Sequence, residues 1–331
     1  MPIPATRDQV QGGTPPSRPI PPHPMDWGFT YVSIRGSNGQ GEEIPLTGFA
    51  NREWPAVFMQ AGATGLDAPP VELFSDESPN LDGSIFRDSR TAAREVMIPV
   101  FLYGIDRSTL RQLKRRLVSA LNPENGYCVL KVMEASTPAR YLYCYYRGGL
   151  EGDEGQDRSG FRWIRYGIQL SAFDPFFYSD DLQVAQWTFG GGTPFLRQDG
   201  GLFPLSLSQG GIPRSSIPIV NPGDVKAWPV WEIRGPVKAF KFTAQDGASF
   251  GIKARPDSSD IVPDGRVLTV DTRPGHKTLK DDRGKNYYPL LDSSPALWPV
   301  PSGSSTAGVE LVASAGSASL RLTLRPRYET Y

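Results

Sequence analysis

The stretch EVMIPVFLYGIDRSTLRQLKRRLVSALNP, residues 95–123, decides the fold because it places a strand, a turn and a helix in immediate succession. Residues 95–103 form an apolar run of strand length, which predicts a β-strand. Pro99 lies within this run and has no backbone N–H, so it predicts a sheet edge or a β-bulge. Gly104-Ile105-Asp106 then turns the chain.

A helix is predicted from about Arg107 to Leu121. Asp106 or Ser108 supplies its N-cap, and Pro123 ends it. Four leucines recur at helical spacing and form one apolar face: Leu110, Leu113, Leu117 and Leu121. The basic residues lie mainly off that face and indicate a solvated surface, with contact to an acidic partner as the alternative: Arg111, Lys114, Arg115 and Arg116.

The high content of glycine and proline indicates β structure along the whole chain. The chain has 331 residues, of which 35 are Gly and 32 are Pro. Such frequent turn residues cut the sequence into short runs, which favours β-sandwich or barrel architecture over long helices. A single core usually stops growing near roughly 250–300 residues, so the length predicts two domains.

The balance of charges argues against a nucleic-acid binder. The 35 Lys and Arg offset 35 Asp and Glu, which gives a formal net charge of +0, whereas binders of nucleic acids usually carry a basic excess. No stretch approaches the ~20 apolar residues of a membrane span, and no secretory signal is evident. We therefore expect synthesis in a cytoplasm and no membrane partner.

Few residues are available for metal binding. The chain has two cysteines, Cys128 and Cys144, and two histidines, His23 and His276. They lack the CxxC or HxxxH spacing of a zinc site. Both cysteines lie in apolar strand-like runs, which indicates buried, reduced thiols. We expect neither a metal nor a cofactor.

Four segments are predicted along the chain. Residues 1–24 hold eight prolines, which lack the N–H groups that helices and sheets need, so they form an extended arm. This arm is either a free terminus or orders against a neighbouring subunit. Residues 25–190 form an N-terminal β domain that contains the helix. A linker rich in Gly, Pro and Ser follows at residues 191–216, and residues 217–331 form a C-terminal β-sandwich.

Alternation of polar and apolar residues locates the strands of the N-terminal domain. Residues 27–34 alternate cleanly, and residues 161–173 place Ile164, Ile168 and Leu170 on their core-facing side. Residues 75–93 are polar and predict an unusually long loop that is either disordered or functional. Shorter strands are predicted at 44–49, 56–59, 127–133 and 140–146.

The C-terminal half has the short runs and frequent turns of a β-sandwich. Turn sequences such as Gln245-Asp246-Gly247 and Asp264-Gly265 separate the runs. Strands are predicted at 202–207, 217–220, 228–233, 239–243, 249–254, 266–271, 276–280, 309–313 and 317–324. Together with the single helix, these strands predict a mainly β protein.

Catalytic motifs are missing from the sequence. It contains neither a phosphate-binding glycine loop nor a GxSxG elbow. Nothing pairs His276 with a nucleophile. The acidic loop at 151–157 fails the calcium-loop spacing, because Arg158 stands where glycine is required and Ile164 where a bidentate glutamate belongs. We therefore expect no catalytic residue and no enzyme.

Two other functions stay open at this point. Trp228, Trp231 and Trp298 would make a sugar platform on the second sandwich if they were exposed, although such tryptophans are more often core residues. A carbohydrate-binding or host-adhesion module is therefore the alternative to a structural role. A hydrolase is the third possibility, because two carboxylates can be close in space and distant in sequence.

Several strings, taken in order, resemble siphophage distal tail proteins. In the N-terminal domain the matching strings are Ala93–Val100, Leu110–Leu117, Leu121-Asn122-Pro123, Arg140-Tyr141-Leu142 and, most specifically, Ala172–Tyr178. The opening of the family's C-terminal domain is matched by Asn221–Asp224, Ala227–Trp231 and Gly235-Pro236. Their order and spacing extend the resemblance over nearly the whole chain past the arm.

The resemblance implies a structural protein of the virion, made in the host bacterium and located at the tail tip. In that family a hexameric ring lies at the end of the tail tube. The N-terminal β domain surrounds the channel through which DNA passes, and a galectin-like C-terminal β-sandwich projects outward. The implied partners are further copies of the chain, the tail tube protein, the tail hub and tape measure proteins, and receptor-binding proteins.

The resemblance does not extend to sugar binding, because the galectin pattern His-x-Asn-x-Arg is missing from the sequence. For assembly, the extended arm at residues 1–24 and the polar segment at 75–93 are the two candidates. Ring closure needs head-to-tail contacts, and exposed strand edges and arms supply them. We expect residues 75–93 to embrace a neighbouring protomer.

Overall fold

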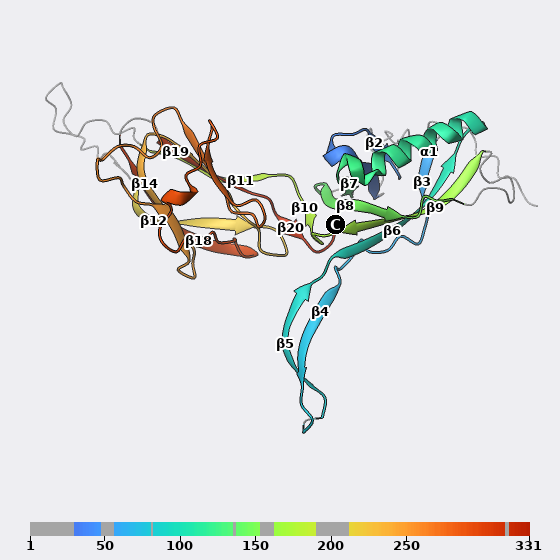
Figure 1. Cartoon of the computed structure of the whole chain (residues 1–331), viewed down its shortest axis with the longest axis horizontal. Helices are drawn as coiled ribbons and strands as arrows, with labels where there is room; N and C mark the ends of the chain where they lie inside the picture. Colours follow the sequence, from blue (N-terminus) through green and yellow to red (C-terminus); the bar gives the residue numbers. More distant parts are fainter. Residues whose placement is uncertain are drawn as a thin grey trace, which may run out of the picture.

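The computed structural model describes residues 30–47, 56–80, 82–134, 137–152, 162–189, 212–314 and 318–331. These residues form two β lobes, joined near the middle of the molecule, and a two-stranded ribbon that extends away from both (Figure 1). The expected mainly β architecture with one α-helix is confirmed for the described part of the chain. The predicted arm at 1–24, most of the predicted linker and the acidic loop from Asp153 onward lie outside the described residues.

The first lobe is built on one large sheet, which has nine strands within the described residues. Seven of them follow one path, in the order β2 (Glu43–Pro45), β1 (Tyr31–Arg35), β7 (Cys128–Met133), β8 (Arg140–Gly148), β9 (Trp163–Ala172), β6 (Arg94–Tyr103) and β3 (Ala56–Met59). The other two, β10 (Phe177–Tyr178) and β20 (Arg327–Tyr328), join this path at β8.

Strand β6 contains the apolar run at 95–103 and is central to the lobe. It pairs with β9 over ten residues, from Arg94 to Tyr103. The inward side chains of both strands are buried, as the alternation in 161–173 predicts. Pro99 lies just past the end of β3, whose pairing with β6 begins at Val100. A residue without an N–H therefore interrupts no pairing with β3 there.

Helix α1 (Arg107–Leu121) has the predicted bounds. Asp106 is the N-cap, and its Oδ1 accepts a hydrogen bond from the Thr109 backbone N–H at 2.7 Å. On the solvent side Arg116 pairs with Glu42 of the same chain at 2.7 Å. The predicted leucines are the buried residues of the helix: Leu110, Leu113, Leu117 and Leu121. The described residues also include three short 3₁₀ helices, Ser37–Gly39, Pro123–Asn125 and Tyr288–Leu290.

The second lobe is a sandwich of two sheets with its own core. One sheet runs β11 (Leu182–Phe189), β19 (Ala318–Leu324), β13 (Val230–Arg234), β16 (Val267–Asp271) and β17 (Thr278–Asp281). The other runs β12 (Ile212–Asn221), β18 (Gly303–Ala313), β14 (Val237–Thr243) and β15 (Ser249–Ile252). Trp231 and Phe242 stack between the two sheets at 4.3 Å.

The structure differs from the predicted segment boundaries on both sides of the linker. Residues 182–189, which the sequence assigned to the first domain, form β11 and pair with β19 of the second lobe. The last residues of the predicted linker belong to β12, which begins at Ile212. Pro213 and Pro218 fit there because β12 is an edge strand. The chain therefore changes lobes at Ser179–Asp181, ahead of the glycine-rich stretch.

The end of the chain also departs from the predicted boundaries. Strand β20 leaves the second lobe and pairs with β10 of the first. Tyr328 and Tyr331 pack against the core of the first lobe. The lobes are therefore connected twice, once by the chain after β10 and once by the chain after β19.

Candidate functional site

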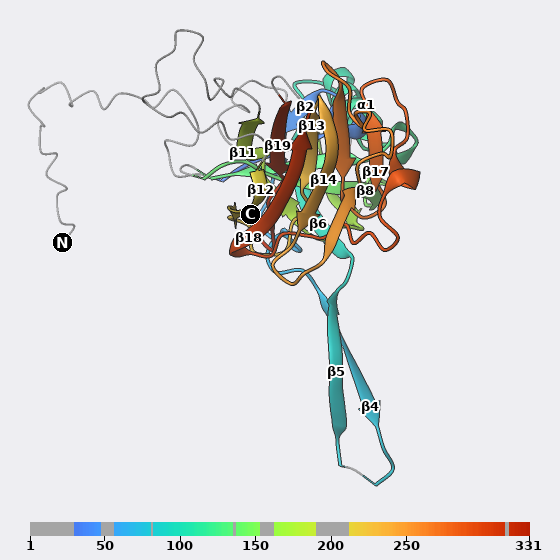
Figure 2. The same cartoon turned by 90° about the vertical axis from the view of Figure 1, so that its left-hand side faces the viewer.

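The ribbon in Figures 1 and 2 is a hairpin made by β4 (Val71–Glu77) and β5 (Ser84–Thr91). The two strands pair antiparallel from Val71↔Thr91 to Glu77↔Ser84, with a bulge between Phe74 and Ser75. Almost every residue of the hairpin is exposed. The hairpin therefore has no buried face within the chain itself.

The hairpin exposes large apolar side chains to an unusual degree. Leu73 is 70% and Phe86 63% exposed, and three others are exposed by 45–57%: Val71, Phe74 and Ile85. Leu73 and Phe74 are consecutive in a strand, so their side chains point to opposite faces. Large apolar side chains exposed on both faces of one element typically mark a contact with another protein.

Two ion pairs across the hairpin help to hold its register. Arg90 Nε lies 2.7 Å from a carboxylate oxygen of Glu72, and Arg87 Nε lies 2.5 Å from Asp76. Exposed pairs of this kind contribute about 0–1 kcal/mol each, and an isolated two-stranded hairpin is marginal in water. Burial against a partner would add the missing stabilisation.

The prediction of a loop at 75–93 was wrong, because these residues form most of a β-hairpin. The prediction rested on the polar composition and the length of this segment. A hairpin with both faces in solvent needs no buried apolar face, so polar residues do not argue against strands there.

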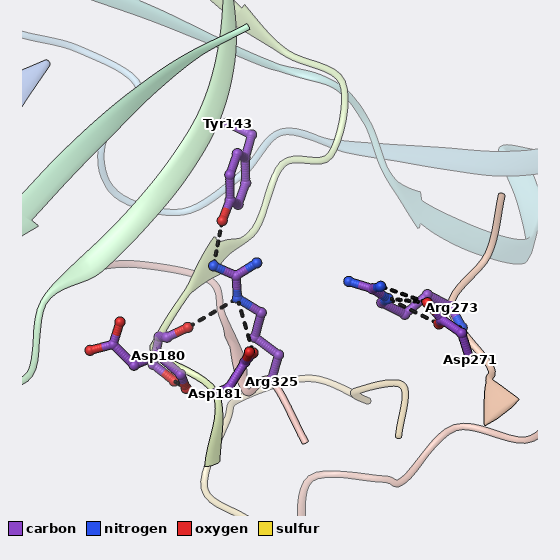
Figure 3. A network of polar contacts seen from close by, with 7 residues as sticks. Tyr143, Asp180, Asp181, Asp271, Arg273 and Arg325 are labelled. Atoms are coloured by element: carbon purple, nitrogen blue, oxygen red, sulfur yellow. Dashed lines mark hydrogen bonds and ion pairs between the residues drawn. The ribbon is translucent and has the colours of Figure 1, made fainter. Parts of the chain in front are cut away.

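A second candidate site is the joint between the lobes, where Arg325 reaches from the end of β19 into the first lobe. Its Nη2 donates to the hydroxyl of Tyr143 on β8, and its Nε donates to the Ser179 carbonyl at 3.2 Å. Asp181 lies 3.7 Å from the same Nε. Figure 3 shows these groups converging on one guanidinium, with the Arg273–Asp271 pair beside them.

Arg327, two residues after Arg325, also binds a carboxylate of the first lobe. Its Nη2 lies 3.0 Å from Asp174, and its guanidinium lies 4.3 Å from the centre of the Phe176 ring. Asp174 also accepts from the Tyr178 hydroxyl at 2.5 Å. Burial, followed by the charge of Asp174, raises the pKa of Tyr178. The phenol therefore stays protonated and keeps donating to that carboxylate.

A groove of about 760 Å³ lies beside this joint. Residues of both lobes line it, and they are mainly aromatic or basic: Tyr127, Tyr143, Tyr145, Phe173, Tyr178, Trp228, Arg273, His276, Arg325 and Arg327. His276, the one histidine predicted in a folded region, is exposed at its rim. Neither a serine nor a cysteine lines the groove, so its lining supplies no partner for a histidine base.

The other residues considered in the sequence lie mostly in the cores. Trp231 and Trp298 are buried in the second lobe, which removes them from a sugar platform, while Trp228 is half-buried in the groove. Cys128 and Cys144 are buried free thiols on neighbouring strands. Within the described ranges, no cluster of three or more His, Cys, Asp or Glu suits a metal, and no helix has the length and apolarity to cross a membrane.

Comparison with known proteins identifies the hairpin-bearing lobe. Residues 67–160 match the model of the phage tail protein RIFT-related domain. This part of the chain is therefore similar to a phage tail domain. The matched residues include the hairpin, α1 and three of the central strands, β6, β7 and β8. No curated protein sequence matches the chain.

The fold of the whole chain has counterparts among phage tail structures. The SPP1 Dit (gp 19.1) protein, described as a paradigm of the hub adsorption apparatus in phages that infect Gram-positive bacteria, aligns with a TM-score of 0.59 at 13% identity. The alignment covers 90% of this chain and 99% of that one. A chain of the phage P2 baseplate in its activated conformation with Ca aligns with a TM-score of 0.52 at 10% identity, covering 92% and 100%. The resemblance to siphophage distal tail proteins is confirmed.

Proposed function

We propose that the chain is a non-enzymatic structural subunit of a siphophage tail, and that six copies close into a ring at the distal end of the tail tube. The observation that carries the proposal is the β4–β5 hairpin, which exposes five large apolar side chains far from its own lobes. The similarity of the hairpin-bearing residues to a phage tail domain supports the location in a tail.

Ring closure explains why such a hairpin extends from the lobe. A ring needs a heterologous interface, in which a projecting element of one copy meets a different surface of the next. The hairpin is the projecting element. Its two apolar faces fit insertion between surfaces of neighbouring copies, since insertion buries Leu73 and Phe74 together.

The proposed ring assigns a role to each part of the chain. The N-terminal domain, predicted at residues 25–190, surrounds a channel through which DNA passes. The C-terminal sandwich, predicted at 217–331, projects outward. The tail tube protein contacts one face of the ring. The tail hub and tape measure proteins contact the other, and receptor-binding proteins attach further out.

Deleting residues 76–90 tests the contact made by the hairpin. Light scattering coupled to size-exclusion chromatography is expected to show closed oligomers for the intact chain and a shift to smaller species for the deletion. A milder variant, Leu73→Ser with Phe86→Ser, is expected to shift the distribution in the same direction. Both exposed side chains contribute little to the fold, so circular dichroism should be unchanged.

The matched control is Val220→Ser with Val312→Ser on the second lobe. These side chains are 52% and 50% exposed, so the control removes a similar apolar surface from another place. Oligomers that survive the hairpin deletion, or that dissociate equally in the control, would contradict the proposed role of the hairpin. Electron microscopy of tails carrying a labelled chain tests the location, because a label along the tube instead of at its end contradicts it.

A further inference from the structure

The groove at the joint contains a continuous series of aromatic rings. Tyr145 contacts Phe173 with ring centres 5.6 Å apart and Tyr127 at 6.5 Å. Tyr127 contacts Tyr143 at 5.3 Å, and Tyr143 contacts Tyr178 at 5.5 Å. This aromatic series is open to solvent at one end, where Phe173 is 72% and Tyr145 39% exposed.

The charged groups of the groove are already paired. Arg273 is bonded to Asp271, and Arg327 is bonded to Asp174. Arg325 is bonded to Tyr143 and lies beside Asp181, whose side chain is 70% exposed. An acidic ligand would therefore find no free arginine among these three. Arg325 and Arg327 also lie over the rings of Tyr143 and Tyr178. The rings left available to a ligand are those of Phe173 and Tyr145, and the exposed carboxylate of Asp181 beside Arg325 favours a single positive charge.

The N-terminal arm has matching chemistry. Residues 15–24 read PPSRPIPPHP. A polyproline II helix has three residues per turn, so residues three apart lie on one edge. One edge then carries Pro16, Pro19 and Pro22, and a second carries Pro15, Arg18, Pro21 and Pro24. Arg18 is the one charged side chain in this segment when His23 is neutral.

We propose that residues 15–24 bind as a polyproline II helix in the groove between the lobes, against the exposed end of the aromatic series at Phe173 and Tyr145. Pro-rich segments with this spacing dock in aromatic-lined grooves, because the helix is preformed and loses little entropy on binding. The two proline edges contact the rings, and Arg18 faces the carboxylates of Asp180 and Asp181. This proposal goes beyond the ring and does not depend on it.

The arm is long enough to reach the groove. Residues 1–24 span about 75 Å as a polyproline II helix, at roughly 3.1 Å per residue. The first described residue, Thr30, precedes β1, which lies in the same sheet as β7 and β8. The groove of the same chain is therefore within this range.

Disulfide trapping in the full chain tests the proposal. Ile20→Cys introduces a thiol on the third edge of the arm and leaves both proline edges intact. His276→Cys introduces its partner at the exposed rim of the groove. Mild oxidation is expected to join them at least about tenfold faster than a pair outside the groove, because docking raises the effective concentration of the two thiols. The native cysteines do not compete, since both are buried.

The matched control pairs Ile20→Cys with Val312→Cys, which lines a separate pocket of about 310 Å³ on the second lobe. Equal rates for the two pairs would overturn the proposal. Another partner that occupies the groove and excludes the arm would give this same result. The size of the trapped product on a non-reducing gel identifies the source of the arm. A monomer places it in its own groove and a dimer in that of a neighbour, and both results support docking.

A second set of variants tests the chemistry of recognition. Replacing Pro16, Pro19 and Pro22 by Ala, or Tyr145 by Ala, is expected to reduce the trapping rate to that of the control pair. Arg18→Glu is expected to reduce it less, since one rim charge is lost and the rings remain. Unchanged trapping after the proline and Tyr145 substitutions would contradict recognition by the aromatic series. The hairpin deletion leaves the groove intact, so failure of the ring and failure of docking are distinguishable.

Discussion

Arg94 binds three separate segments of the chain through its guanidinium. Its side chain is buried and donates to the backbone carbonyls of Gly65, Asp67, Pro175 and Glu329 at 2.5–3.0 Å. These carbonyls belong to the loop before the hairpin, the chain before β10 and the C-terminal tail. One side chain at the start of β6 therefore holds the base of the hairpin to the joint between the lobes.

Replacing Arg94 by Met is expected to lower the free energy of unfolding of the first lobe by about 3 kcal/mol, because it leaves buried carbonyl groups without donors. Urea unfolding followed by hydrogen exchange of each lobe measures the loss. The control is Arg87→Met, whose exposed ion pair contributes within about 0.5 kcal/mol. Equal losses in the two variants would show that the carbonyl contacts of Arg94 add nothing.

The two cysteines are expected not to react with thiol reagents in the folded chain. Burial raises the pKa of the Cys128 thiol to about 12 and that of Cys144 well above its ordinary value. At pH 8 roughly one Cys128 in ten thousand is then a thiolate, the reactive form. A thiol reagent should label neither residue until urea unfolds the protein, and full labelling within minutes in native buffer would contradict this.

At the scale of elements, the contact of α1 with the sheet depends on its leucine face. Leu117 is fully buried, whereas the adjacent Val118 is 51% exposed. Leu117→Ala should destabilise the first lobe by about 2–5 kcal/mol through the cavity it leaves. Val118→Ala should change stability by less than about 0.5 kcal/mol. Thermal unfolding of both variants measures the difference, and similar losses would argue against the packed face.

Periodicity in the sequence predicted the elements that bury one face. The leucines of α1 and the alternation in β9 both lie against the core, and both were located correctly. The hairpin was missed because both of its faces are exposed, so no residue pattern distinguishes an inner from an outer face. The groove was missed for another reason, because its lining comes from segments far apart in the sequence. They include β8, β10, the loops before β13 and after β16, and the segment after β19. Residues brought together by the return of the C-terminal segment share no local pattern.

At the scale of the whole molecule, the boundary between the lobes is set by which core a strand packs against, and the glycine-rich composition of the following stretch does not mark it. The predicted boundary at residue 190 used the glycine-rich stretch as the marker of a linker. The chain changes lobes earlier, at Ser179–Asp181, because Val184 and Trp187 of β11 pack on the second core. Ser179, Asp180 and Asp181 form this crossing. In the sequence, such a short polar segment cannot be distinguished from the turn of a hairpin.

The second connection, after β19, is expected to fix the angle between the lobes. Arg325, just after β19, donates to Tyr143 and Ser179 of the first lobe. Arg327 of β20 donates to Asp174 of the first lobe and to the Lys226 carbonyl of the second. Replacing both arginines by Gln should leave both cores folded and widen the distribution of interlobe distances measured by small-angle scattering. Arg321→Gln is the control, because Arg321 pairs with Glu232 within the second lobe. An unchanged distribution would mean that backbone pairing holds the joint, through β10–β20 and the bridge between Val225 and Arg327, instead of the two guanidinium groups.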